Sequence, residues 1–142
     1  MIRRSLLAAP ALMLFAVAPA IAGELTVSNA WSRTTPPGIG MGVVYLKIHN
    51  NSTKSDRLLK LKASVASSAE VHRTEIVEGV ARMREVSVLH VAASERLEFA
   101  PGGMHIMLMG LKKPLVEGQK FNLELLFEVA GPRKVTVVVR KA

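Results

Sequence analysis

The stretch Phe121-Asn122-Leu123-Glu124-Leu125-Leu126-Phe127-Glu128-Val129 decides the fold class of this chain. Every odd position in it is apolar, and three of the four even positions carry Asn or Glu. Because successive side chains of a strand point to opposite faces, this alternation predicts a β-strand with one buried face and one solvated face.

Similar short segments recur through the chain, separated by turn-forming residues. In one of them the pattern assigns Leu59, Leu61 and Ala63 to one face and Lys60 and Lys62 to the other. No window after residue 22 predicts an amphipathic helix, so we expect an all-β fold with a single antiparallel β-sandwich or barrel. Further strands are predicted over residues 43–48 and 135–139 and a hairpin over 71–83, with turns at Glu78-Gly79, Pro101-Gly102-Gly103 and Gly131-Pro132.

The first residues predict export. Met1-Ile2-Arg3-Arg4 is followed by an apolar run that ends near Ala20 and by the small-x-small sequence Ala20-Ile21-Ala22. These are the three parts of a secretory signal peptide, and the apolar run is too short to span a membrane. We therefore expect a signal peptide over residues 1–22, a periplasmic protein, and one domain over residues 23–142.

Composition excludes several functions. The chain has no Cys, so a metal site cannot use thiolate, a blue-copper electron-transfer centre is excluded, and no mature N-terminal Cys can carry a lipid. The net charge of +8 falls to +6 without Arg3 and Arg4. The basic residues are scattered and aromatic residues are few, which argues against nucleic-acid binding. The sequence contains no nucleophile elbow and no paired-carboxylate arrangement, so we do not expect an enzyme.

His and Met residues are the chemically distinctive ones. The densest group is Met104-His105-Ile106-Met107-Leu108-Met109, in which His105, Met107 and Met109 share one face of a strand. A two-residue turn at Glu78-Gly79 would pair Thr74 with Met83 and His72 with Glu85. His72 and Met83 would then be diagonal neighbours about 7–8 Å apart, within bridging reach of one ion.

Two imidazoles and two thioethers form a soft, uncharged ligand set that selects Cu(I) over zinc, calcium or magnesium. It suits an oxidising compartment, where thiolates are at risk of oxidation. The competing interpretation is that each Met fills a core gap and each His is an ordinary surface or hydrogen-bonded residue. We adopt that interpretation for His49, His90 and Met41. We expect Met104 and Met109 to serve packing, and the alternative is that they support the ligands or compete for the ion.

The spacing H-x10-M-x21-H-x-M, formed by His72, Met83, His105 and Met107, resembles the signature of the periplasmic copper chaperone family PCu(A)C. Arg73 departs from the family pattern, because many members have Met beside the first His. The chain also lacks the His- and Met-rich tail of some relatives, so a second, Cu(II)-preferring site is not expected. The similarity extends over residues 30–33, 44–50, 101–107, 110–111 and 118–127.

This resemblance implies a cupredoxin-like Greek-key β-sandwich that holds one Cu(I) with the four motif residues. It also implies delivery of the ion to the binuclear copper centre of cytochrome c oxidase, with subunit II or another copper-assembly protein as the partner. We expect a monomer with no nucleic-acid partner and no membrane insertion. A copper buffer without a dedicated acceptor needs the same site and remains the alternative. A metal-free interaction module would leave the motif spacing a coincidence.

Overall fold

A computed structural model describes residues 24–141, so the predicted signal peptide over residues 1–22 lies outside the described residues. The described part folds into ten β-strands without a helix, and it therefore offers no helix long and apolar enough to cross a membrane. The strands are β1 (Leu25–Arg33), β2 (Met41–Asn50), β3 (Asp56–Ala63), β4 (Ala66–Val77), β5 (Val80–Glu85), β6 (Leu89–Val91), β7 (Arg96–Glu98), β8 (Met104–Leu111), β9 (Lys120–Phe127) and β10 (Gly131–Arg140).

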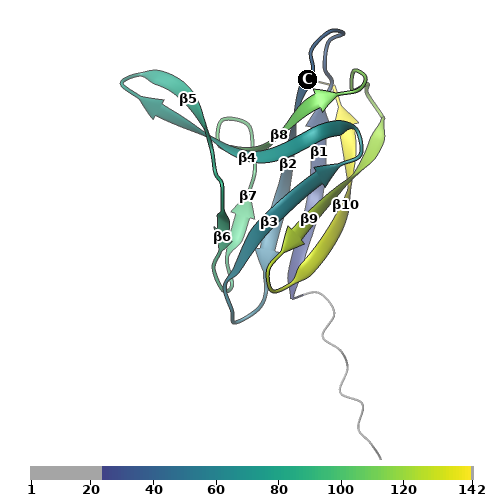
Figure 1. Cartoon of the computed structure of the whole chain (residues 1–142). Coiled ribbons are helices and arrows are strands. Elements are labelled where there is room, and N and C mark those ends of the chain that lie inside the picture. Colours follow the sequence, from purple (N-terminus) through teal and green to yellow (C-terminus); the bar gives the residue numbers. More distant parts are fainter. Residues whose placement is uncertain (1–23, 142) are drawn as a thin grey trace, which may run out of the picture.

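All ten strands belong to one sheet, with the order β5-β4-β8-β2-β1-β10-β9-β3-β6 and with β7 paired to β2. The sheet folds over on itself (Figure 1). Inward side chains of β2 and β8 share one apolar core with those of β9 and β10. The predicted all-β sandwich is confirmed. One pair, β1 with β10, is parallel, whereas the other strand pairs are antiparallel.

Strand β9 has the alternation that its sequence predicts, and its odd-numbered side chains from Phe121 to Phe127 are buried. The strand ends at Phe127, and Val129 is exposed. The turn occupies residues 128–130 and β10 begins at Gly131, so the predicted turn at Gly131-Pro132 was placed slightly too late.

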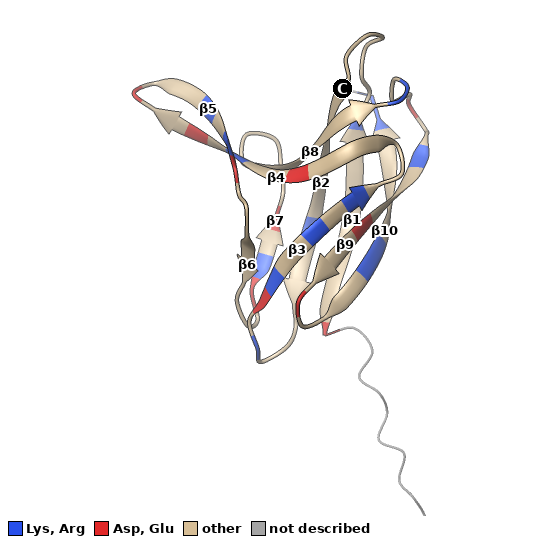
Figure 2. Cartoon of the chain, viewed as in Figure 1, with Lys and Arg blue, Asp and Glu red and all other residues tan. Residues whose placement is uncertain are grey.

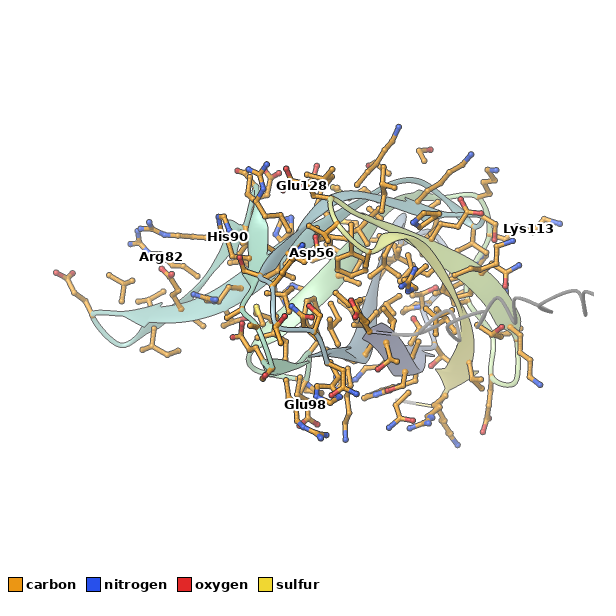
Figure 3. The ribbon with its side chains drawn as sticks, turned by 90° about the horizontal axis from the view of Figure 1, so that it is seen from below. Asp56, Arg82, His90, Glu98, Lys113 and Glu128 are labelled. Carbon is orange, nitrogen blue, oxygen red and sulfur yellow. The ribbon has the colours of Figure 1, made fainter. Side chains whose placement is uncertain are left out.

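A buried carboxylate holds this turn. Asp56, at the start of β3, accepts hydrogen bonds from the backbone N–H groups of Val129 and Ala130 at 2.8 and 2.9 Å. Figure 3 shows Asp56 and Glu128 close to one another. In Figure 2, Lys and Arg residues lie on β3 and β10 themselves. Asp56 thereby ties β3 to the β9–β10 hairpin at this end of the sandwich.

Strand β3 departs from the predicted alternation. Leu58 pairs with Phe127, but Lys60 pairs with Leu126, so one extra residue lies on β3. This β-bulge changes which side chains face inward: Leu58 is buried and Leu59 is 52% exposed. The prediction that Leu59 shares a face with Ala63 is therefore wrong, because the bulge lies between them.

Strands β4 and β5 form a hairpin that projects from the body of the sandwich (Figure 1), and we call residues 72–85 the arm. Its turn residues Glu78 and Gly79 have φ values of 51° and 77°, as a type I′ turn requires. The predicted register is confirmed, because Thr74 pairs with Met83. β5 is an edge strand with every residue exposed, and Arg82 lies far out along the arm in Figure 3.

Candidate metal centre

The register of three neighbouring strands brings the four candidate ligands to one face. His72 of β4 pairs directly with His105 of β8, and their ring centroids are 6.0 Å apart. Met107 lies two residues from His105 on the same face of β8. Met83 of β5 pairs with Thr74, which is two residues from His72 on β4. Along the strands the paired positions run from Glu70–Met107 through His72–His105 to Thr74–Met83, so the two His lie between the two Met.

His105 is buried and oriented as a metal-binding side chain would be, with one ring nitrogen hydrogen-bonded and the other free among the described residues. It is only 4% exposed, and its Nδ1 lies 3.3 Å from the carbonyl oxygen of Gly103. Because a carbonyl only accepts, Nδ1 carries the proton and Nε2 carries the lone pair. Within residues 24–141, Nε2 has no hydrogen-bond partner. Metal-binding His residues are commonly oriented in this way, by a ring N–H donated to a backbone carbonyl.

His72 is oriented by a carboxylate. Its Nε2 lies 3.1 Å from Oε2 of Glu70, which accepts the hydrogen bond, so the lone pair of the neutral ring is on Nδ1. At a metal–nitrogen distance of about 2 Å, each ring centroid lies about 3 Å from the ion. The observed separation of 6.0 Å is therefore at the upper end of what one ion shared by His72 and His105 requires.

The two thioethers differ in access. Met107 is 6% exposed, whereas Met83 on the arm is 60% exposed. The centre thus has a buried side on β8 and an open side on the arm.

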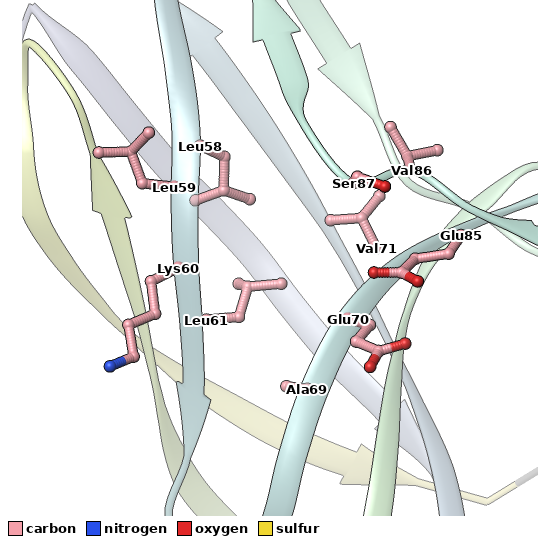
Figure 4. Close-up of a pocket in the computed structure, with 10 residues that line it drawn as sticks. All are labelled: Leu58, Leu59, Lys60, Leu61, Ala69, Glu70, Val71, Glu85, Val86 and Ser87. Carbon is pink, nitrogen blue, oxygen red and sulfur yellow. The ribbon is translucent and has the colours of Figure 1, made fainter.

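Glu70 was missed by the sequence reasoning, although its position two residues before His72 places it on the same face. It pairs with Met107, and Glu85 pairs with His72, so two carboxylates flank that imidazole. Figure 4 shows Glu70 and Glu85 along the pocket between β3 and the base of the arm. Across the described residues no group of three or more His, Cys, Asp or Glu could hold an ion.

The other methionines have different roles. Met104 packs partly against the core, and its sulfur accepts a hydrogen bond from Arg73 at 3.7 Å. Met109 is half-buried on the face that carries His105 and Met107, and its assignment to packing stays a prediction. Met41 pairs with Met109 but is 50% exposed, so the prediction that Met41 serves packing is wrong. It lies at the first position of β2, where little of the sheet covers it.

The two remaining histidines lie outside the strands of the centre. His90 on β6 is exposed and His49 on β2 is half-buried. His49 is opposite Thr26 and Arg96, and His90 is opposite Arg57, so neither residue is opposite a position of β4, β5 or β8. These positions agree with the prediction that both are ordinary surface or hydrogen-bonded residues.

Known proteins resemble this chain over most of its length. The family model described as "Putative lipoprotein LpqE-like" matches residues 25–139. The Leifsonia xyli subsp. xyli protein Lxx21020 is 36% identical over 120 residues, which cover 84% of this chain and 71% of that protein.

Two solved structures have a similar fold. The structure of CuI-DR1885 from Deinococcus radiodurans has a TM-score of 0.64 and 29% identity, and the match covers 84% of this chain and 81% of that one. The copper-bound PCuAC domain from PmoF2 has a TM-score of 0.71 at 22% identity, with coverage of 84% and 95%, which supports the predicted cupredoxin-like fold. With its family match over residues 25–139, the chain belongs to the LpqE-like family of PCuAC proteins.

Proposed function

We propose that this protein is an exported, periplasmic carrier of Cu(I) and not an enzyme, and that it holds one ion with His72, Met83, His105 and Met107. The observation that carries the proposal is the buried Nε2 of His105, which lacks a partner in the described chain and belongs to a ring whose centroid lies 6.0 Å from that of His72. The Cu(I) form of the similar protein from Deinococcus radiodurans supports the choice of ion.

The donor set fits Cu(I). Nε2 of His105 and Nδ1 of His72 offer nitrogen lone pairs, and the two thioethers offer soft sulfur. None of these four ligands has to lose a proton when it binds, so the bound ion keeps its single positive charge. The carboxylate of Glu70 beside His72 partly offsets that charge.

Delivery would be a ligand exchange. Met83 is the exposed ligand, so an incoming ligand of the acceptor would displace its thioether first. Acceptor thiolates bind Cu(I) more strongly than thioethers do, and the ion would then leave His72, Met107 and His105. The copper stays Cu(I) throughout, and only coordinate bonds form and break. The acceptor that we propose is the binuclear copper centre of cytochrome c oxidase.

The test is a titration of Cu(I) against a coloured Cu(I) chelator. The exported mature protein is compared with a variant in which all four ligands are replaced by Ala, and with a His49→Ala, His90→Ala control. One equivalent should bind to the wild-type protein and to the control, and none to the fourfold variant. Equal loading of all three proteins would refute the ligand assignment.

A second measurement separates a chaperone from a copper buffer without a dedicated acceptor, which needs the same ligands. The loaded protein is mixed with the copper-free soluble domain of oxidase subunit II, the two proteins are separated after set times, and transfer is followed by the copper content of each. Transfer through a transient complex predicts a rate that rises with acceptor concentration and then saturates. A rate fixed by spontaneous release of the ion would instead indicate a buffer.

A further inference from the structure

The face that carries the candidate ligands continues across the sheet. Met107 of β8 pairs with Val43 of β2. Ser32 of β1 pairs with Val44 in the antiparallel register, so the next residue of β1, Arg33, lies opposite Val43. Arg33 pairs in turn with Arg140 of β10. Because neighbouring strands are about 4.8 Å apart, Arg33 lies about 10 Å and Arg140 about 15 Å from Met107 across the sheet.

Aromatic rings of the same face support both guanidinium groups. Trp31 pairs with Tyr45, and their ring centroids are 4.7 Å apart. Arg33 lies over the Tyr45 ring at 5.8 Å, and Arg140 lies over the Trp31 ring at 5.3 Å. Guanidinium groups at these distances are attracted to the ring faces, and the stacking limits the orientations that they adopt.

These two cations are not neutralised within the described chain. Arg33 and Arg140 are exposed and directly opposite one another, and no ion pair among residues 24–141 includes either of them. Other cations nearby are paired, as Lys47 is with Glu98 at 4.0 Å. Like charges at paired positions oppose each other, so this arrangement costs stability in the free protein.

We infer that Arg33 and Arg140, stacked on Tyr45 and Trp31, form a docking surface for the acidic face of a copper-accepting protein. The inference rests on the proposed Cu(I) carrier function. The bound ion adds a third positive charge to this face, and Glu70 and Glu85 add two negative charges on its β4–β5 side. The side with Arg33 and Arg140 stays positive, so a partner that presents carboxylates around its own copper ligands is complementary to it.

The dimensions agree with a protein partner. From β5, which carries Met83, to β10, which carries Arg140, the sheet has five strand spacings, so the candidate ligands and the two Arg span about 24 Å. A patch of this width fits within the roughly 800 Å² that one partner contributes to a standard interface. Arg and Trp side chains are also enriched at the centres of such interfaces. A planar, weakly hydrated guanidinium is suited to bidentate pairing with a carboxylate.

The experiment measures the rate of copper transfer from the loaded protein to the copper-free soluble domain of oxidase subunit II at several salt concentrations. The variants are R33Q/R140Q, the charge-conserving R33K/R140K, and the control K54Q/K62Q, which removes two exposed and unpaired charges elsewhere on the surface. The Cu(I) affinity of each variant is measured separately by chelator competition.

The wild-type rate should fall about tenfold between low and high salt, because electrostatic steering is screened. R33Q/R140Q should transfer several-fold more slowly at low salt, with a flatter salt dependence and unchanged Cu(I) affinity. R33K/R140K should recover most of the rate, and K54Q/K62Q should resemble the wild type.

Equal rates for R33Q/R140Q and the wild type would overturn the docking surface and leave the carrier function intact. A wild-type protein that loads copper but transfers none to this acceptor would remove the proposed delivery, and the docking inference with it. Vesicles containing anionic lipid provide the last comparison. Binding to them that depends on Arg33 and Arg140, without any effect of these residues on transfer, would assign the surface to a membrane and overturn the inference.

Discussion

Replacing His105 by Leu should make the copper-free protein more stable while abolishing its copper binding. His105 is almost fully buried, and its unpaired Nε2 costs about 1–3 kcal/mol relative to an apolar side chain of similar size. The change sacrifices the Nδ1–H bond to Gly103, which is long at 3.3 Å and contributes about 0.5–1.5 kcal/mol. The Gly103 carbonyl keeps its bond from the N–H of Thr74 at 3.2 Å. The net expectation is a stabilisation of about 0.5–1.5 kcal/mol.

The assay is urea unfolding of the copper-free proteins in the presence of a Cu(I) chelator, repeated with excess Cu(I). A free ion concentration of 100 times the Kd should add about 2.7 kcal/mol to the wild type and almost nothing to His105→Leu, so the order of stability should reverse. His90→Leu on the exposed surface of β6 is the control, with an expected change within about 0.5 kcal/mol. A copper-free His105→Leu variant less stable than the wild type by more than about 1 kcal/mol would refute the reasoning.

Three further predictions concern other parts of the molecule. Met83→Leu should leave the copper-free stability within about 0.5 kcal/mol, because the side chain is exposed, but should weaken Cu(I) binding in the chelator competition; unchanged affinity would remove Met83 from the ligand set. Asp56→Ala should cost about 2–4 kcal/mol in urea unfolding, because two N–H groups of the β9–β10 turn lose a charged acceptor, and a loss under about 1 kcal/mol would contradict that role. The hydrogen bond from Arg57 lowers the pKa of Glu128, so its stabilising contribution is complete above the ordinary Glu pKa of about 4.5 and is lost as the pH falls through the lowered folded-state pKa. Glu128→Gln should therefore destabilise the protein more at pH 7 than at pH 3, and equal effects at both pH values in urea unfolding would count against the pairing.

Local features of the sequence predicted local features of the fold. The period-two alternation of β9 needs only its own residues, and so does the type I′ turn at Glu78-Gly79, which fixes the arm register by itself. Because that register was correct, the placement of His72 and Met83 on one face was also correct.

Features that depend on distant partners were not predictable. The bulge beside Leu59 exists only relative to β9, which lies more than sixty residues later. The parallel pairing of β1 with β10 joins the two ends of the domain, and nothing local to either strand specifies its direction. The alignment of Arg140 with Arg33, and so with the metal face, follows from that pairing.

The candidate site shows the same division. The sequence pattern predicted which face of β8 carries His105 and Met107. It did not predict that both would be almost fully buried, since burial depends on what neighbouring strands place around them. It also did not predict which nitrogen of His72 is free, because that depends on the carboxylate of Glu70.

The candidate ligands lie on strands of different stability, because β5 is held weakly and β8 is held firmly. Because β5 is an edge strand without a buried side chain, its opening breaks backbone hydrogen bonds and exposes little further apolar surface. Amide protons of residues 80–85 should therefore exchange with solvent long before those of β8, whose centre is buried on both faces. An ion shared by Met83 and His105 would link these two regions. Copper loading would then slow amide exchange in β5 by suppressing its local opening, while the interior of β8 would still exchange only through global unfolding, which the bound ion also makes rarer.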